Sequence, residues 1–181
     1  MRIIAGEWRG RPLAAPEGQG TRPTSDRARE GLFSMLQSRL GTFDGLHVAD
    51  LFAGTGALGL EALSRGAAHC TFVEKERAAL DVLKQNVARF GAESRTDIRA
   101  QAIEYVPPPA RPCDMIFLDP PYAAGLAEMA LARICNAAWV APAGRVSIET
   151  SGERPNVPSG FAVEAERRFG KAYILLIRKK D

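Results

Sequence analysis

The residues best suited to chemistry in this 181-residue chain are Asp119-Pro120-Pro121-Tyr122. They follow residues 114–118, where four apolar residues come after an acidic one, as in a buried strand of a parallel sheet. Each proline fixes its own φ and restricts the residue before it, so Asp119 and the Pro120 carbonyl are held at the edge where α/β sheets bind ligands. These two acceptors can hold a planar amine while Tyr122 stacks on its ring. A plain surface turn is the alternative interpretation.

A second group of candidate residues lies in a βαβ unit that opens the core of the chain. A buried strand over residues 46–52 runs into a glycine turn, a helix is expected over about 57–65, and a strand over 70–73 ends at Glu74. The glycines allow a ligand to approach the backbone, and the N-terminus of the helix points at it. Glu74 is placed to accept hydrogen bonds from the two hydroxyls of a ribose.

The glycine turn has the spacing Gly54-x-Gly56-x-x-Gly59, which formally matches the dinucleotide-binding pattern. That pattern alone fits a nicotinamide-dependent oxidoreductase as well as a protein that binds a nucleoside without a pyrophosphate. Asp50, in the strand before the turn, favours the second class, because a buried carboxylate can order the turn and face a cation but sits badly beside a pyrophosphate. The sequence therefore favours a sulfonium cofactor with an amino-acid tail.

The rest of the core predicts a continued alternation of helices and strands. A helix over 77–90 and a strand over 97–100 lead to Gln101 and Ala102. A side chain or a backbone amide at these positions can contact the edge of an adenine. After Asp119, a helix is expected over 125–137, a strand over 144–149, and an antiparallel hairpin over 162–169 and 173–178. These elements predict an α/β fold.

Residues 1–23 predict short extended pieces that pair as a hairpin around residues 6–10. Arg9, Arg11 and Arg22 flank Trp8 in this arm. Arginine beside an aromatic ring suits phosphate contact and base stacking, which predicts RNA binding. The alternative is a loose arm in which Trp8 is only a hydrophobic anchor.

A helix is expected after this arm, with Thr24 or Ser25 as its N-cap and apolar residues at helical spacing between 28 and 40. Arg27, Arg29 and Glu30 fall outside its apolar face. Residues 41–45 form the boundary with the core, so the extension is expected to span 1–45 and the catalytic part 46–181.

The composition and charge of the chain favour some classes of protein and argue against others. Residues 1–40 carry seven arginines against four acids and residues 165–181 carry six basic residues against two acids, which favours a polyanionic partner unless these charges only solvate the termini. Three cysteines without a C-x-x-C spacing predict reduced thiols and a cytoplasmic location. The presence of only two histidines argues against a histidine metal site, and neither a signal peptide nor a membrane span is expected.

Over about residues 46–180, the chain resembles a class I S-adenosylmethionine-dependent methyltransferase. The resemblance rests on the Gly54/Gly56 turn after Asp50, on Glu74 after the second strand, and on Asp119-Pro-Pro-Tyr after the fourth strand. Residues 2–11 and 22–33 resemble the N-terminal signatures of the RsmD family, the bacterial 16S ribosomal RNA guanine-N2 methyltransferases. The resemblance implies a Rossmann-like, seven-stranded, mostly parallel sheet with a C-terminal antiparallel hairpin.

The resemblance also implies a monomeric enzyme that takes its methyl group from S-adenosylmethionine, uses no metal, and acts on 16S ribosomal RNA, either as naked RNA or within an assembling small subunit. It assigns catalysis to Asp119, Pro120 and Tyr122. The cofactor-binding residues that it implies are Asp50, Phe52, Ala53, Gly54, Gly56, Glu74, Gln101, Ala102 and Asp119. Gln101 departs from the pattern, because many class I enzymes carry an acidic residue there.

Two other functions compete with this interpretation. A DNA adenine-N6 methyltransferase shares the Asp-Pro-Pro-Tyr motif, but these 181 residues leave no room for a separate target-recognition domain. A non-catalytic RNA-binding assembly factor is the second, and the intact Asp50, Gly54, Gly56, Glu74 and Asp119 speak against it.

Overall fold

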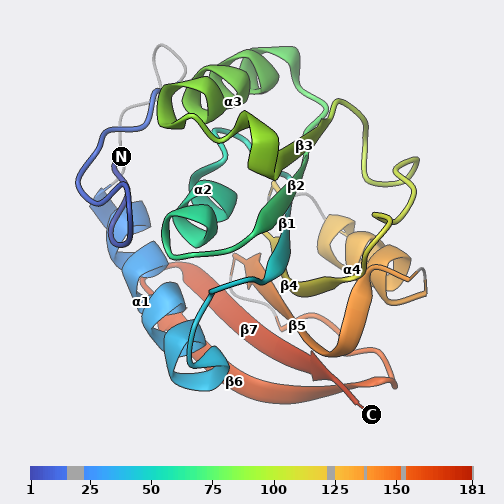
Figure 1. Cartoon of the computed structure of the whole chain (residues 1–181). Coiled ribbons are helices and arrows are strands. Elements are labelled where there is room, and N and C mark those ends of the chain that lie inside the picture. Colours follow the sequence, from blue (N-terminus) through green and yellow to red (C-terminus); the bar gives the residue numbers. More distant parts are fainter. Residues whose placement is uncertain (16–22, 122–124, 137, 152–153, 181) are drawn as a thin grey trace.

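The chain forms one seven-stranded sheet with helices on both faces (Figure 1). The computed structural model describes residues 1–15, 23–121, 125–136, 138–151 and 154–180. The strand order is β3-β2-β1-β4-β5-β7-β6. The strands are β1 (His47–Leu51), β2 (His69–Val73), β3 (Thr96–Arg99), β4 (Cys113–Leu118), β5 (Val140–Thr150), β6 (Phe161–Phe169) and β7 (Ala172–Lys179).

The first five strands pair in parallel, and β7 pairs antiparallel with both β5 and β6. The predicted fold, a mostly parallel Rossmann-like sheet that closes with an antiparallel hairpin, is therefore confirmed. β5 is longer than the predicted strand over 144–149, because its pairing with β4 continues across a register shift to Val140.

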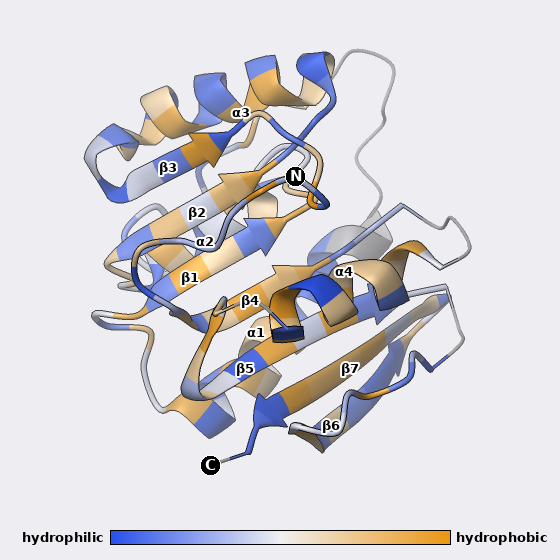
Figure 2. Ribbon diagram, turned by 90° about the vertical axis from the view of Figure 1, so that its right-hand side faces the viewer, coloured by the Kyte–Doolittle hydropathy of each residue, from blue (hydrophilic) through white to orange (hydrophobic). Residues whose placement is uncertain are grey.

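Two hydrophobic layers cover the sheet. The helices are α1 (Pro23–Leu40), α2 (Ala57–Ser64), α3 (Arg77–Phe90) and α4 (Leu126–Asn136), with a short 3-10 turn over Glu93–Arg95. On one face, residues of α1, α2 and α3 form one hydrophobic cluster with Met115 and Phe117 of β4; on the other, residues of α4 form a second cluster with Ile116 and Leu118. Successive side chains over residues 115–118 thus enter opposite layers, which explains the unbroken apolar run in the sequence. In Figure 2 much of the sheet has the hydrophobic colour.

Helix α1 differs from its prediction at two points. It begins at Pro23, where proline is favoured in a first turn, so Thr24 and Ser25 lie inside the helix and neither is its N-cap. Arg29 is buried rather than solvent-exposed. Its guanidinium donates hydrogen bonds to the Arg2 carbonyl and to Asp26. Burial lowers the pKa of Arg29, while Asp26 opposes that shift.

The N-terminal arm forms the predicted hairpin, closed by a bridge between Arg2 and Pro12. It is held to α2 through its backbone: the N–H groups of Ile4 and Ala5 donate to the buried Glu61 carboxylate at 2.7 and 3.0 Å. Gly6 has φ 84°, and a Cβ there would lie 1.8 Å from the Ser64 carbonyl oxygen. Only glycine allows so close an approach in this conformation, so the arm is a docked part of the fold.

Candidate active site

The predicted chemical residues gather at one edge of the sheet, the carboxyl ends of the four adjacent strands β3, β2, β1 and β4 (Figure 1). Glu74 follows β2, the glycine turn follows β1, and Asp119 follows β4. Because β1 lies between β2 and β4, the predicted cofactor residues and the predicted amine-binding residues are neighbours.

The turn after β1 is built from an unusual backbone. Phe52 has φ 69°, a left-handed conformation that costs a non-glycine residue about 1–2 kcal/mol. It redirects the chain so that the N–H groups of Phe52 and Ala53 both donate to the Val73 carbonyl at 3.0 Å. Such strain concentrates at functional sites. Sequence reasoning named Phe52 without anticipating this role.

Asp50 is 1% exposed and accepts a hydrogen bond from the Gly59 N–H at 2.9 Å. It therefore fixes the first turn of α2 behind the glycine turn, as predicted. Burial, together with the nearby charges of Asp119 and Glu74, raises the pKa of Asp50 to about 8, against the lowering effect of the Gly59 hydrogen bond. A carboxylate in this position favours a positively charged ligand, because a cation would restore its ionised form.

Glu74 organises the same turn. Its Oε1 accepts the N–H groups of Lys75 and Glu76, and its Oε2 accepts that of Gly54, all at 2.8 Å. A carboxylate offers about four acceptor positions, so one remains on Oε2 for a hydroxyl donor. The predicted contact with both hydroxyls of a ribose would require Glu74 to exchange one of its backbone partners.

Gln101 and Ala102 follow β3, the strand that pairs with β2, so they lie on the far side of Glu74 from the glycine turn. Gln101 is exposed, Ala102 is half-buried, and Ile103 is buried beneath them. Their predicted contact with an adenine edge stays a prediction.

Asp119 and Pro120 lie directly after β4, as predicted, whereas Tyr122 lies outside the described residues. Desolvation by the surrounding protein raises the pKa of Asp119 to about 6, although its side chain still reaches solvent. Sequence reasoning missed Glu149, at the end of the neighbouring strand β5. Burial and the charge of Asp119 raise the pKa of Glu149 to about 7.

Asn86 of α3 is a second residue that sequence reasoning missed. It is fully buried, and its amide nitrogen donates to the carbonyls of Ala14 and Thr55 at 3.1 and 2.9 Å. Its Oδ1 accepts the Ala14 N–H at 2.8 Å. Asn86 therefore joins the end of the arm to the glycine turn. No local pattern signals such a residue; only a polar position on the inner face of α3 hints at it.

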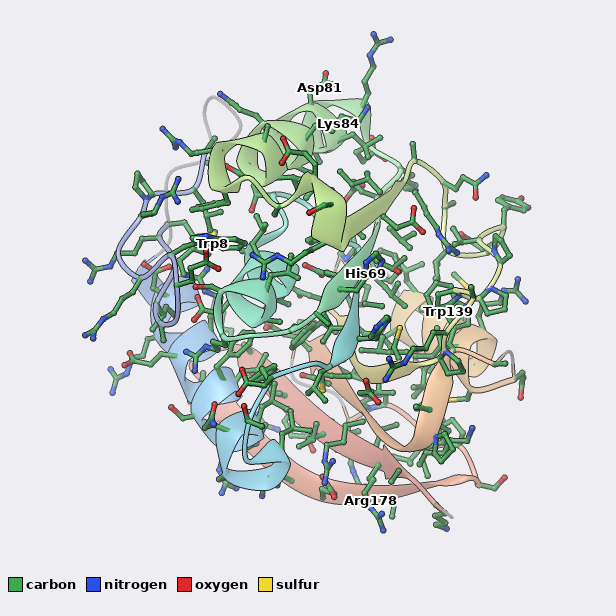
Figure 3. The ribbon with its side chains drawn as sticks, viewed as in Figure 1. Trp8, His69, Asp81, Lys84, Trp139 and Arg178 are labelled. Atoms are coloured by element: carbon green, nitrogen blue, oxygen red, sulfur yellow. The ribbon has the colours of Figure 1, made fainter. Side chains whose placement is uncertain are left out.

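The structure corrects the prediction that Trp8 stacks on RNA bases. Trp8 is 3% exposed, and its ring stacks on Phe90 of α3 at a centroid distance of 4.9 Å. Arg95 covers the indole at 5.0 Å. Figure 3 shows Trp8 between the arm and the helices α2 and α3. Its large apolar surface is used to attach the arm to the core, so no face of the ring is open to a base.

The basic residues of the arm that were predicted to bind RNA differ in how free their side chains are. Arg9 is exposed. Arg11 is also exposed, but its guanidinium donates to the Arg89 carbonyl at 2.6 Å and lies 4.6 Å from the Phe90 ring centroid. Arg22 lies outside the described residues. In the part of the chain that the structure describes, no cluster of side chains is suited to hold a metal ion, and no helix is long and apolar enough to cross a membrane.

Comparisons with known proteins agree on one family. The family described as conserved hypothetical protein 95 matches residues 1–178. The chain is 36% identical over 182 residues to ribosomal RNA small subunit methyltransferase D of Escherichia coli strain K12, with 99% of this chain and 90% of that protein covered. The Haemophilus influenzae protein of the same name is 35% identical over 175 residues, covering 94% and 89%.

A solved structure extends this agreement to three dimensions. The Escherichia coli protein yhhF superimposes with a TM-score of 0.88 at 34% sequence identity, over 99% of this chain and 98% of that one. The shared architecture includes the N-terminal arm as well as the sheet, because the alignment covers nearly the whole of both chains. The chain therefore belongs to the RsmD family of class I methyltransferases.

Proposed function

We propose that this protein transfers a methyl group from S-adenosylmethionine to the exocyclic N2 of a guanine in 16S ribosomal RNA, as a cytoplasmic monomer that acts on the assembling small subunit. The observation that carries the proposal is the placement of Asp119 and Pro120 at the end of β4, beside the turn that follows β1. The printed names of the Escherichia coli and Haemophilus influenzae relatives support ribosomal RNA as the substrate.

The residues after β1 and β2 fit this cofactor. A Cβ at Gly54 would meet no protein atom within 4 Å, so the space in front of the turn is open to a ligand. Glu74 keeps one acceptor position for a hydroxyl, and the buried Asp50 favours positive charge. When bound, S-adenosylmethionine supplies a methyl group already activated by its sulfonium. The protein therefore needs to position the amine and exclude water rather than provide a strong base.

Asp119 and Pro120 act on the amine. The lone pair of guanine N2 is delocalised into the ring, which makes this nitrogen a poor nucleophile. In the proposal, the Asp119 carboxylate and the Pro120 carbonyl each accept a hydrogen bond from N2, so that the nitrogen moves towards a tetrahedral shape and its lone pair points at the methyl group. One N2 proton then leaves to solvent, and S-adenosylhomocysteine is the second product. Tyr122 stacks on a base that has been turned out of its RNA neighbours.

The arm supplies contacts to the RNA backbone. Arg9 is exposed on the hairpin, and Asn86 joins the end of that hairpin to the glycine turn. Phosphates bound by Arg9 would therefore lie on the same rigid body as the cofactor site. Arginine contacts of this kind fix the position of an RNA without selecting its sequence.

Arg9→Ala is expected to weaken binding of small-subunit RNA and to lower the slope of log affinity against log salt by about 1, because one phosphate contact is lost. S-adenosylmethionine affinity should not change. The measurement is RNA binding at a series of salt concentrations. Arg111→Ala, at an exposed position beside the amino end of β4, removes the same charge and serves as the matched control. An unchanged slope in Arg9→Ala would leave the arm with a structural role only.

The function itself is tested by mass mapping of methylated nucleotides in small-subunit RNA from cells that lack this protein. One guanine should lose its N2 methyl group and regain it when the protein is restored. Loss of an adenine-N6 methyl group from DNA instead would favour the DNA methyltransferase. Calorimetric titration with S-adenosylmethionine and with NAD tests the cofactor separately, and binding of NAD alone would contradict the methyltransferase assignment for this site.

A further inference from the structure

Glu149 lies beside the residue proposed to hold the reacting amine. In the parallel pairing of β4 with β5, Phe117 is level with Ser147 and Leu118 is level with Ile148. Continuing this register by one residue beyond β4 brings Asp119 level with Glu149, and the charge of Asp119 acts on Glu149. Adjacent strands lie about 4.8 Å apart, and side chains at equivalent positions of a parallel pair share a face. The two carboxyl groups therefore stand next to each other at the active edge.

These two carboxyl groups lack the donors that the other acids of this edge have. Asp50 accepts the Gly59 N–H, and Glu74 accepts three backbone N–H groups. Across the described residues, no hydrogen bond or ion pair reaches the side chain of Asp119 or of Glu149. Instead, burial and the charge of Asp119 together raise the pKa of Glu149 to about 7. Two adjacent acceptors without donors match a ligand that brings several donors along one edge.

Guanine has such an edge. Its N2 amine carries two hydrogens, and the adjacent ring nitrogen N1 carries a third, so three donors follow one another. Adenine presents its N6 amine next to an N1 that carries no hydrogen and is an acceptor. A carboxylate opposite N1 therefore forms a hydrogen bond with guanine and faces a lone pair in adenine, which leaves both acceptors unpaired and costs binding.

We propose that the Glu149 carboxylate accepts a hydrogen bond from N1–H of the target guanine, while Asp119 accepts one from N2, so that Glu149 selects guanine over bases whose N1 carries no hydrogen. This inference rests on the proposed transfer to guanine N2. It assigns Glu149 the recognition of the base, and it leaves orientation of the reacting amine to Asp119 and Pro120.

The test uses 2-aminopurine, which keeps the exocyclic N2 amine but has no hydrogen on N1. Once the target position has been mapped, small-subunit RNA is assembled with guanine or 2-aminopurine at that position, and single-turnover methyl transfer is measured. The unaltered protein should prefer guanine by about tenfold to a hundredfold, since an acceptor is left unpaired with the analogue. In Glu149→Gln the amide can accept from N1–H of guanine through its oxygen or donate to the unprotonated N1 of 2-aminopurine through its nitrogen, so the preference should fall to about one.

Two further variants isolate the effect. Glu149→Ala removes the acceptor without supplying a donor, so transfer to guanine should slow and the preference over 2-aminopurine should narrow without reversing. Glu93→Gln removes an exposed carboxylate near the start of β3, at the opposite edge, and should keep the full preference. S-adenosylmethionine affinity should be the same in all of these proteins. If the unaltered protein methylates guanine N2 but Glu149→Gln keeps its preference for guanine, the inference is overturned. If the unaltered protein does not methylate guanine N2 at all, the proposed function itself fails.

Discussion

Asp119→Ala is expected to slow single-turnover methyl transfer to small-subunit RNA by about a hundredfold or more, because the amine loses one of its two acceptors and its orientation. A displacement of about 1 Å of a reacting group is enough for a loss of this size. The fold should be unaffected, since Asp119 lies just beyond β4 and its side chain reaches solvent. Affinity for S-adenosylmethionine should also be retained, because the glycine turn and Glu74 are intact.

Asp119→Asn provides the matched variant. It keeps the shape of the side chain but can present a donor to a donor, so it should also be slow. Rate and cofactor affinity are measured on the same preparations. Near-normal transfer by Asp119→Ala would remove this residue from the mechanism. A loss of S-adenosylmethionine affinity equal to the loss of rate would assign Asp119 to the cofactor instead of the amine.

Trp8→Ala is expected to lower the free energy of unfolding by about 3–5 kcal/mol, the range for removal of a large buried aromatic side chain. Trp8 is 3% exposed and stacks on Phe90, so its removal leaves a cavity between the arm and α3. Denaturant unfolding followed by circular dichroism measures the change. Trp8→Phe keeps an aromatic ring against Phe90 and should lose clearly less stability.

The same pair of variants separates the two roles that the sequence allowed for Trp8. If Trp8 stacked on RNA bases, Trp8→Ala would bind RNA more weakly while keeping its stability. The structure predicts the opposite result, a larger loss of stability than of RNA affinity. Trp8→Ala should lower the free energy of unfolding. At a temperature where the variant is fully folded, its RNA affinity should fall only to the extent that the arm has detached from α3.

The core of the fold could be predicted from the sequence because its signals are local. Residues 115–118 of β4 are all apolar because both faces of the strand are covered there, and the spacing of Gly54, Gly56 and Gly59 marks the turn after β1. Gly59 is needed for packing: a Cβ there would lie 2.3 Å from the Phe72 ring. At these positions the structure agrees with what the sequence predicts.

The remaining features depend on contacts between distant segments. Glu149 is one acid at the end of an apolar strand, and only the pairing of β5 with β4 places it beside Asp119. Arg29 looks like a surface residue by helical spacing, yet the arm covers it. The ring of Trp8 suits base stacking and core packing equally well, and the decision rests on where Phe90 lies.

The way the arm is attached has a consequence for how this enzyme can change over generations. Glu61, Ser64 and Asn86 hold the arm, and the atoms that they hold are main-chain N–H and carbonyl groups. Main-chain groups are common to nearly all amino acids, so an exposed position such as Arg9 can be substituted without altering the path of the arm. In the proposed function, substitution of Arg9 can therefore adjust the affinity for RNA independently of the geometry of methyl transfer, so a lineage can alter the first while the second is kept.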